Sequence, residues 1–338
     1  MNTKIVTTTD KASYSEAVEL LQAGEVVAFP TETVYGLGAV ATNEEAVKKI
    51  FQAKGRPSDN PLIVHIGTKE ELDLYIANIS DVAKQCMDAF WPGPLTLVME
   101  AKQDVLAPSV MPGKETVGMR MPDHPVALEL LQQLKLPLAA PSANRSGKPS
   151  PTKAAHVFED LNDIIPAILD GGVTGIGLES TVLDVTLTPP VILRPGGVTK
   201  EMLEAVIGPV LQPTIAEQKM ESTPKAPGMK YTHYAPNAPV YLLEEGADIA
   251  QAIMTLQAQQ HKVALLAPTS YATLPADYYF TFGEAAHLEE MANTLYDALR
   301  SCDKTDATII LATTTSTEGV GAAIMNRLEK AAGGKWYK

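Results

Sequence analysis

Hydrophobic and polar positions over residues 1–208 alternate between short apolar runs and longer amphipathic stretches. Short apolar runs bounded by Gly, Pro or polar residues have the length of buried strands, whereas apolar residues spaced three and four apart favour helices. We expect strands at Val26–Phe29, Leu62–Ile66, Pro94–Met99, Val117–Met121, Leu136–Ala140, Ile164–Leu169, Thr181–Val185 and Val191–Leu193.

Capping residues mark the ends of the expected helices. Asn43 can accept a backbone N–H from the first turn of the helix that follows it, and Gly55 favours the end of that helix. Ser13 and Glu16 have the spacing of a capping box before another helix. We expect helices at Ala17–Gln22, Glu44–Ala53, Lys69–Ile76, Asp81–Phe90, Pro125–Leu134 and Thr152–Leu161.

The connections between these elements indicate a mixed sheet. The segment Ser142–Ser150 is dense in small polar residues and does not have the pattern of the crossover helix that a regular parallel βαβ unit requires. Residues 1–208 therefore predict an α/β domain with a twisted mixed sheet and flanking helices.

The pattern changes twice after residue 208. Repeated prolines and little periodicity over 209–238 are typical of an extended linker. Strand and helix patterns then alternate over 239–338, which predicts a second, smaller, Rossmann-like α/β domain of three layers. Its expected strands and helices are Val240–Leu243, Asp248–Gln257, Val263–Leu266, Tyr278–Phe282, Glu284–Arg300, Ala307–Ala312 and Val320–Ala331.

Composition narrows the class of protein. The 338 residues are 45% hydrophobic, which excludes intrinsic disorder, and the net charge of −13 argues against a general nucleic-acid binder. No apolar run reaches the length of a membrane span, and Met1–Ser13 lacks the apolar stretch of a signal peptide. Two distant cysteines cannot form a disulfide framework or a metal site alone. We expect a cytoplasmic protein that does not associate with membranes.

Two N-terminal segments carry candidate chemistry. Phe29–Gly38 alternates three hydroxyls and ends in glycines that allow close approach by a ligand or a strand, although a strand end with a turn explains it equally well. Lys54 and Arg56 can bind phosphate, although cations also favour a helix C-terminus. His65, on an expected strand, is more often structural than catalytic.

Later segments add an arginine and a polar loop. Arg120 lies in an apolar strand and needs either an internal acid or a ligand carboxylate or phosphate, and both remain open. The loop over 138–151 can cradle phosphates or serve as a polar connection, and it lacks the Walker A order. Gly175–Gly177 and Gly319–Gly321 lack the third glycine of a dinucleotide fingerprint, so packing explains them.

Five motifs in order resemble the YrdC-type proteins. They are Pro30-Thr-Glu-Thr-Val-Tyr-Gly-Leu, Lys54-Gly-Arg-Pro-x-x-x-Pro-Leu, Gly93-Pro-Leu-Thr, Pro141-Ser-Ala-Asn and Leu178-Glu-Ser-Thr-Val. The resemblance covers roughly residues 10–205, and Pro227-Gly-Met-Lys-Tyr-Thr-His-Tyr-Ala-Pro236 with the tail is similar to the long, two-domain form of the family.

The resemblance implies a nucleotidyltransferase that makes threonylcarbamoyl-adenylate and pyrophosphate from L-threonine, bicarbonate and ATP. It implies Mg²⁺ with ATP, no organic cofactor and no separate metal site. The product would pass to a tRNA threonylcarbamoyl-transferase, and direct tRNA binding is not expected. Threonine would bind at Thr33, His65, Arg120, Ala140 and Ser180. ATP would bind at Arg56, Asn60, Thr116, Ser142, Asn144, Ser150, Arg194 and Tyr234, with Lys54, Arg56 and Arg194 neutralising charge during catalysis.

Two other functions remain as alternatives. An RNA-binding regulatory module of YrdC-like fold is disfavoured by the acidic balance and the few aromatic residues. A carbamoyl-transfer domain of the hydrogenase-maturation type would carry zinc fingers, which two cysteines cannot form. On the resemblance, Tyr234 would bring the linker back over the nucleotide as a lid.

Overall fold

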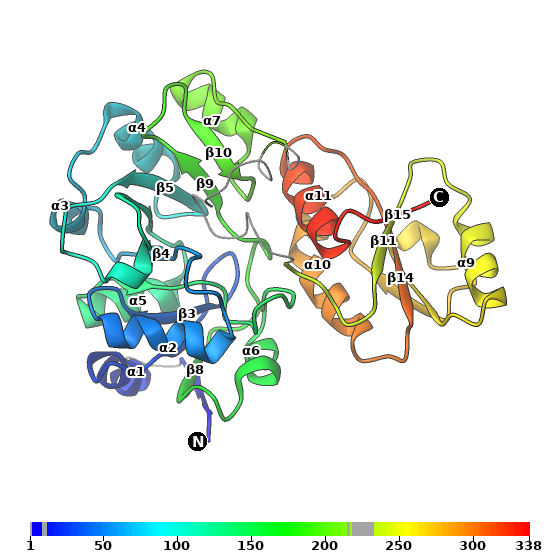
Figure 1. The fold of residues 1–338 in the computed structure, drawn as a ribbon, viewed down its shortest axis with the longest axis horizontal. Helices are drawn as coiled ribbons and strands as arrows, with labels where there is room; N and C mark the ends of the chain where they lie inside the picture. The colour runs from blue at the N-terminus through cyan, green and yellow to red at the C-terminus, as the bar shows by residue number, and fades with distance from the viewer. Residues whose placement is uncertain (1, 9–11, 215–216, 218–232) are drawn as a thin grey trace. The chain divides into compact units, whose positions relative to one another are not determined.

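The computed structural model describes residues 2–8, 12–214, 217 and 233–338. The chain divides into two compact units (Figure 1). The first unit comprises Met1–Ser146, Pro151–Gly175 and Glu179–Lys230, and the second comprises Gly147–Ser150, Ile176–Leu178 and Tyr231–Lys338. Most of the expected linker over 209–238, including Lys230 and Tyr231, lies outside the described residues.

The first unit is built on a mixed sheet in the order β1-β8-β2-β3-β7-β4-β6-β5-β9-β10. Parallel pairs, such as β4 with β6 and β5 with β9, adjoin antiparallel ones, such as β5 with β6. The mixed sheet is the one that the sequence predicts. Its strands are β1 (Lys4–Thr7), β2 (Val27–Phe29), β3 (Gly36–Val40), β4 (Ile63–His65), β5 (Leu95–Glu100), β6 (Thr116–Arg120), β7 (Leu138–Ala139), β8 (Ala167–Asp170), β9 (Thr181–Asp184) and β10 (Val191–Arg194).

Helices cover both faces of this sheet. Successive strand residues point to opposite faces, so Val27 and Phe29 of β2 pack with α1 and α5, while Ala28 joins the cluster that contains α2, α4, α6 and α7. The helices are α1 (Ala12–Gln22), α2 (Glu44–Lys54), α3 (Leu72–Tyr75), α4 (Asp81–Phe90), α5 (Pro125–Leu134), α6 (Ala154–Leu161) and α7 (Lys200–Ile207).

The predicted ends of α2 are confirmed, and the predicted start of α1 is not. Asn43 accepts a hydrogen bond from the Ala46 N–H at 3.1 Å, and Gly55 ends α2 in the left-handed conformation, as expected. The capping-box prediction at Ser13 is wrong, because α1 already includes Ala12 and Ser13 therefore lies inside the helix.

Glycines in β3 let two strands approach closely. A Cβ atom on Gly38 would lie 2.8 Å from the ring of Phe29 on the neighbouring strand β2. Gly38 therefore permits the close packing of β3 against the Phe29 ring of β2.

The second unit contains a five-stranded sheet in the order β13-β12-β14-β11-β15, in which every pair is parallel. Helix α9 packs on one face and α10 with α11 on the other, as Figure 1 shows. This is the three-layer arrangement that the sequence predicts. The elements are β11 (Val240–Leu243), α9 (Ile249–Ala258), β12 (Val263–Ala267), β13 (Tyr278–Thr281), α10 (Leu288–Cys302), β14 (Ile309–Thr313), α11 (Val320–Ala331) and β15 (Trp336–Tyr337).

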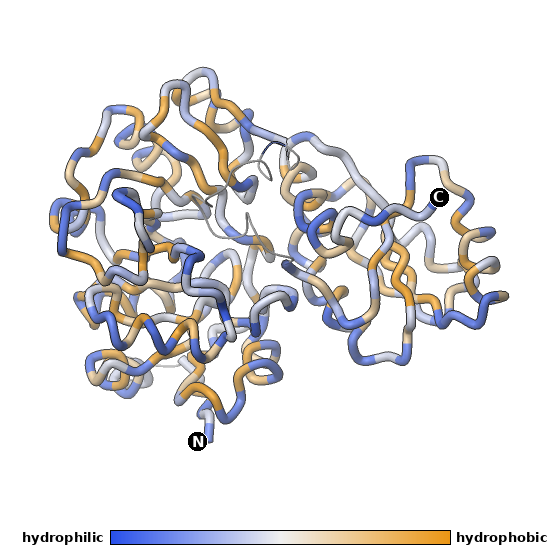
Figure 2. Tube along the Cα trace, viewed as in Figure 1, coloured by the Kyte–Doolittle hydropathy of each residue, from blue (hydrophilic) through white to orange (hydrophobic). Residues whose placement is uncertain are grey.

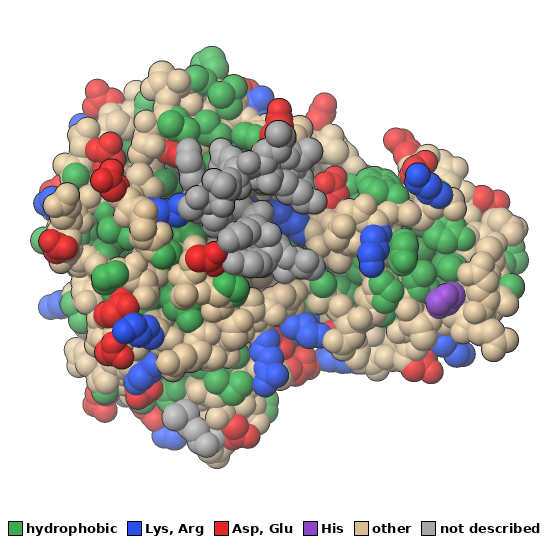
Figure 3. All heavy atoms as spheres, in the orientation of Figure 1, with side chains coloured by type: hydrophobic (Ala, Val, Ile, Leu, Met, Phe, Trp, Pro, Cys, Tyr) green, Lys and Arg blue, Asp and Glu red, His purple; other side chains and the backbone are tan. Residues whose placement is uncertain are grey.

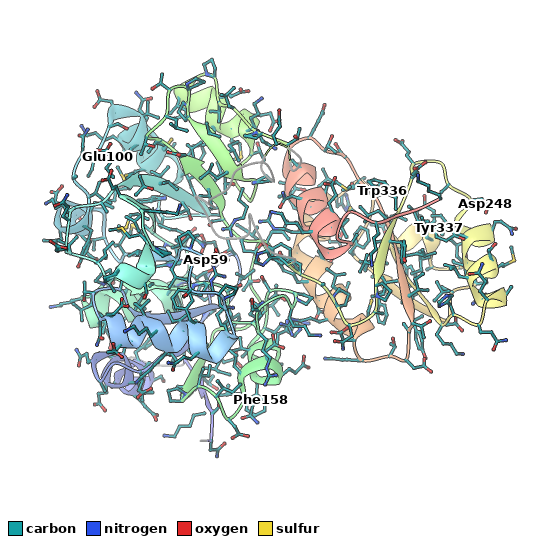
Figure 4. The ribbon with its side chains drawn as sticks, viewed as in Figure 1. Asp59, Glu100, Phe158, Asp248, Trp336 and Tyr337 are labelled. Carbon is teal, nitrogen blue, oxygen red and sulfur yellow. The ribbon has the colours of Figure 1, made fainter. Side chains whose placement is uncertain are left out.

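Hydrophobic residues concentrate in the strands of both units and along one side of the helices (Figure 2). Trp336 and Tyr337 form the short edge strand β15 beside β11 (Figure 4), which the sequence pattern did not predict. Within the described residues, no helix has both the length and the apolar character needed to cross a membrane.

Candidate active site

The centre of the first unit's sheet brings several candidate residues together. His65 and Arg120, the last residues of the parallel strands β4 and β6, are register partners. Ala140, just beyond β7, donates its N–H to the carbonyl of Ile63 at 2.9 Å. The ring of Phe29 meets the His65 ring edge-on, with centroids 6.1 Å apart. His65 and Arg120 therefore lie side by side at the ends of β4 and β6, whereas Ala140 lies beside Ile63 at the start of β4.

Arg120 has an internal acidic partner, which was one of the two alternatives that the sequence left open. Its Nη2 lies 2.7 Å from Oε1 of Glu32, and its Nε donates to the carbonyl of Gly93 at 3.3 Å. The pair with Glu32 is a close contact of charges rather than an aligned hydrogen bond. Glu32 was not among the predicted site residues, although a lone acid in a segment of threonines and apolar residues was a signal for it.

His65 is held neutral by its surroundings. Burial, and then the positive charge of Arg120, lower the pKa of His65 to about 3. Its Nδ1 is buried and has no hydrogen-bond partner among the described residues. A neutral imidazole with a spare ring nitrogen can donate to or accept from a polar ligand group, depending on its tautomer.

Thr33 lies in the turn that joins β2 to β3. Its hydroxyl is 2.8 Å from the hydroxyl of Thr31, which in turn donates to the carbonyl of Val34 at 2.7 Å. Both threonines are buried. Thr31 therefore fixes the turn, and Thr33 carries a hydroxyl whose position is set by its neighbour.

Ser180 and Arg194 are joined directly. Arg194, the last residue of β10, donates to the carbonyl of Ser180 from Nε at 3.1 Å and from Nη2 at 3.0 Å. The Ser180 hydroxyl also meets the hydroxyl of Thr96 at 2.8 Å. The predicted threonine residue Ser180 and the predicted phosphate residue Arg194 are thus adjacent.

Lys54 organises the polar loop that follows β7. Its ammonium donates to the carbonyls of Ser142 and Asn144, each at 2.5 Å, and approaches Oδ1 of Asn144 at 3.4 Å. The Ser142 hydroxyl donates to the same Oδ1 at 2.6 Å. The structure therefore brings Lys54, Ser142 and Asn144 together, with the lysine holding the backbone of the loop.

Arg56 and Asn60 belong to the loop between α2 and β4, which also carries Asp59 (Figure 4). Arg56 donates from Nη2 to the carbonyl of Pro61 at 3.2 Å, and Oδ1 of Asn60 is buried without a hydrogen-bond partner among the described residues. Thr116 begins β6, so it lies roughly 13 Å along the strand from Arg120 at about 3.3 Å per residue. The structure does not bring Thr116 to Arg120.

Ser150 and Tyr234 belong to the second unit. The Tyr234 ring is buried, with its centroid 5.3 Å from that of Tyr296 and 5.7 Å from the guanidinium carbon of Arg327. Ser150 is also buried, and its neighbour Pro149 accepts a hydrogen bond from Nη2 of Arg300 at 2.6 Å. Both residues are therefore held by packing within their unit.

Charged side chains of both signs lie on the face of the molecule that Figure 3 draws. On the face drawn in Figure 3, acidic and basic residues are interspersed. In the part of the chain that the structure describes, no three His, Cys, Asp or Glu side chains gather in a way that could hold a metal ion.

Comparison with known proteins identifies relatives of both units. Residues 19–196 match the Sua5_yciO_yrdC family, described as telomere recombination, and residues 198–333 match the threonylcarbamoyl-AMP synthase C-terminal domain. A threonylcarbamoyl-AMP synthase of Bacillus subtilis is 52% identical over 330 residues, which are 97% of this chain and 95% of its own. The crystal structure of P. abyssi Sua5 complexed with L-threonine is similar with a TM-score of 0.94 and 45% identity, and 99% of each chain is covered.

A shorter relative matches less than half of the chain. A threonylcarbamoyl-AMP synthase of Photobacterium profundum is 37% identical over 163 residues, which are 47% of this chain but 87% of its own. Fold and site together define a YrdC-like α/β protein with cationic and hydroxyl groups at adjoining strand ends. The chain belongs to the Sua5/YciO/YrdC family, in the long form that carries the threonylcarbamoyl-AMP synthase C-terminal domain.

Proposed function

We propose that this protein is a threonylcarbamoyl-AMP synthase, a nucleotidyltransferase that joins L-threonine, bicarbonate-derived CO₂ and the AMP part of ATP, with release of pyrophosphate. The observation that carries the proposal is the direct link between the two predicted subsites. Ser180, on the amino-acid side, accepts two hydrogen bonds from Arg194, on the phosphate side. A reaction that joins an amino-acid derivative to the α-phosphate needs the two substrates side by side in this way.

The amino-acid subsite comprises His65, Arg120 and Ala140, with Thr33 and Ser180. Arg120 is the group that binds the carboxylate, because a guanidinium forms paired, charge-assisted hydrogen bonds with a carboxylate. His65 and Ser180 can hydrogen-bond the other polar groups of threonine.

In the first unit, the nucleotide subsite comprises Arg56, Asn60, Thr116, Ser142, Asn144 and Arg194. In this proposal Arg56 and Arg194 contact phosphate oxygens, and Asn60 supplies a buried amide whose oxygen has no hydrogen bond from the described residues. Lys54 contributes through the loop that it holds, because three oxygens of Ser142 and Asn144 already surround its ammonium.

In the chemical sequence, the neutral threonine amine adds to CO₂ and releases a proton to water, which gives a carbamate. A carbamate oxygen then attacks the α-phosphorus, and the bond to the β,γ-pyrophosphate breaks. No covalent enzyme intermediate is needed, so catalysis rests on positioning and on neutralising charge. Mg²⁺ would enter as the MgATP substrate and neutralise phosphate charge, because it keeps water and phosphate oxygens as most of its ligands.

The product would be consumed by a transferase that modifies tRNA, and we place the reaction in the cytoplasm. The deciding experiment follows pyrophosphate release by the purified protein with ATP and Mg²⁺. Release should require both L-threonine and bicarbonate, and mass spectrometry should identify threonylcarbamoyl-adenylate. Pyrophosphate release that is independent of threonine would contradict the proposal.

A further inference from the structure

Glu32 and Arg120 form an ion pair inside the first unit's core. Their side chains are 11% and 5% exposed, whereas those of the Lys49–Glu25 pair, which has the same separation of 2.7 Å, are 38% and 34% exposed. Removing two charges from water is costly, so a buried pair calls for a reason beyond stability.

The carboxylate of Glu32 has unused capacity to accept hydrogen bonds. Neither of its oxygens, both of them buried, accepts an aligned hydrogen bond from the described residues. A carboxylate has about four acceptor positions. The negative charge of Glu32 also reaches His124, where it partly offsets the lowering of the His124 pKa by burial. Glu32 is therefore a buried acceptor that remains able to take several donors.

A free amino acid has the charges that complement this pair. It is a zwitterion, with a carboxylate that suits Arg120 and an α-ammonium that has three N–H donors for a carboxylate. The pair and the ligand each have no net charge, so exchanging partners brings no uncompensated charge into the core. Glu32 is also the sequence neighbour of Thr33, a predicted threonine contact.

We propose that Glu32 binds the α-ammonium of the amino-acid substrate and so selects free amino acids over carboxylates that lack an amine. This inference rests on the proposed function, because it assigns a new residue to the same amino-acid subsite. Glu32 and Arg120 then exchange one ion pair for two: guanidinium with substrate carboxylate, and glutamate with substrate ammonium.

The test compares two ligands that differ only at the amine. Isothermal titration calorimetry measures L-threonine and 2,3-dihydroxybutanoate of the same configuration, in which a hydroxyl replaces the ammonium. In the unaltered protein, threonine should bind more tightly than the hydroxy acid. In Glu32→Gln, threonine affinity should fall about 10- to 100-fold, the usual effect of losing a charge-assisted hydrogen bond. The affinity for the hydroxy acid should change less than about threefold.

Three outcomes would overturn the inference. Equal weakening of both ligands means that Glu32 only positions Arg120. Tighter binding of both ligands means that Glu32 competes with the substrate carboxylate. If the unaltered protein binds both ligands with equal affinity, the protein does not recognise the ammonium. Each of these can occur in a protein that still makes threonylcarbamoyl-adenylate, whereas failure of the proposed function appears as no threonine binding and no pyrophosphate release.

Two further variants guard against a folding defect. Glu25→Gln makes the same chemical change at the exposed Lys49 pair and should leave both affinities unchanged. Glu32→Asp keeps the charge and should retain a preference for threonine over the hydroxy acid, even if thermal melting shows that Glu32→Gln is unstable. Loss of that preference in a folded Glu32→Asp variant would show that the retained charge does not bind the ammonium, and it would contradict the inference. If the folded Glu32→Gln and Glu32→Asp variants both keep the full preference of the unaltered protein for threonine, the inference is contradicted.

Discussion

At the scale of single residues, the amino-acid subsite depends on charges that are placed where water cannot reach them. Arg120 is 4% exposed and His65 is register-paired with it on the next strand. Burial, and then the same positive charge that suits a carboxylate, lower the pKa of His65 and keep the imidazole neutral. The sequence showed that Arg120 needed an anion, but only the fold shows that Glu32 reaches it.

The depressed pKa of His65 has a consequence for stability against pH. The pKa is about 3 in the folded protein against 6.5 as its ordinary value, so the unfolded chain binds more protons between these two pH values. The stabilisation is therefore present above pH 6.5 and is lost as the pH falls. We expect His65→Gln to flatten the acid limb by up to about 1.4 kcal/mol per pH unit.

Urea unfolding between pH 4 and pH 7 measures this effect on the first unit. His287→Gln, an exposed histidine of the second unit, is the control and should keep the slope of the parent protein. A His65→Gln slope equal to that of the parent would show that the imidazole does not govern acid stability.

Arg120 should be required for threonine binding but not for ATP binding. Arg120→Ala removes the carboxylate partner, so calorimetry should detect no threonine binding while ATP binding persists. It also leaves Glu32 buried without its partner, which should lower the free energy of unfolding by about 3–5 kcal/mol. Loss of ATP affinity with threonine affinity intact would reverse the assignment.

Arg194→Ala and Arg56→Ala should impair adenylate formation more than threonine binding. A lost charge-assisted contact to phosphate should lower the rate about 10- to 100-fold. Pyrophosphate release measures adenylate formation, and calorimetric titration with threonine measures threonine binding. Turnover at the parent rate in both variants would exclude these residues as phosphate contacts.

At the scale of elements, the end of α2 supports the polar loop after β7. The backbone carbonyl of Lys54 accepts from Ser146, and its ammonium donates to Ser142 and Asn144, so one residue holds the loop at three places. Lys54→Met keeps the length of the side chain but removes the donors. We expect faster hydrogen exchange over residues 142–146 and a higher KM for ATP.

Lys48→Met is the matched control for this loop prediction. Lys48 lies on the exposed side of the same helix and pairs with Glu45 at 2.8 Å. It should change neither the exchange of the loop nor the KM. If Lys54→Met raises the KM without faster exchange, the ammonium acts on the nucleotide directly and the support role is wrong.

The sequence predicted helices and strands correctly where local chemistry determines their ends. It failed where a strand depends on contacts with a neighbouring strand. Asn43 and Gly55 mark the ends of α2 by hydrogen bonding and backbone conformation, which sequence reveals. The strand β3 was missed, because its glycines weaken strand propensity and its pairing depends on the Phe29 ring of β2. The strands β1 and β15 were missed for a related reason: each is short, and its sheet partner supplies the stability.

At the scale of the whole molecule, each unit has a sheet and a core of its own. The first unit's core includes clusters on both faces of its sheet, and the second unit buries its own cluster beneath α9. The alternation of strand and helix patterns predicted both sheets. The candidate site was less accessible to prediction, because residues such as Thr96 and Ser180 meet only through the parallel pairing of β5 and β9.

Truncation tests whether the chain beyond the first sheet contributes to the active site. A chain that ends after Gly208 keeps the whole mixed sheet and α7, so we expect it to fold as a cooperative unit by circular dichroism. It lacks Tyr234 and its packing partners Tyr296 and Arg327. We expect sharply reduced synthase activity, at least about tenfold, because the predicted nucleotide contact is gone.

The full-length variant Tyr234→Ala separates the tyrosine from the rest of the second unit. It should reproduce much of the loss if Tyr234 itself contacts the nucleotide, and limited proteolysis after residue 208 should slow when ATP and threonine are both present. The Photobacterium profundum relative matches 47% of this chain over 87% of its own length, so a self-sufficient first unit is the alternative to test. A truncated chain that makes threonylcarbamoyl-adenylate at the full rate, with no ligand-dependent protection in the parent, would establish that alternative and refute the lid.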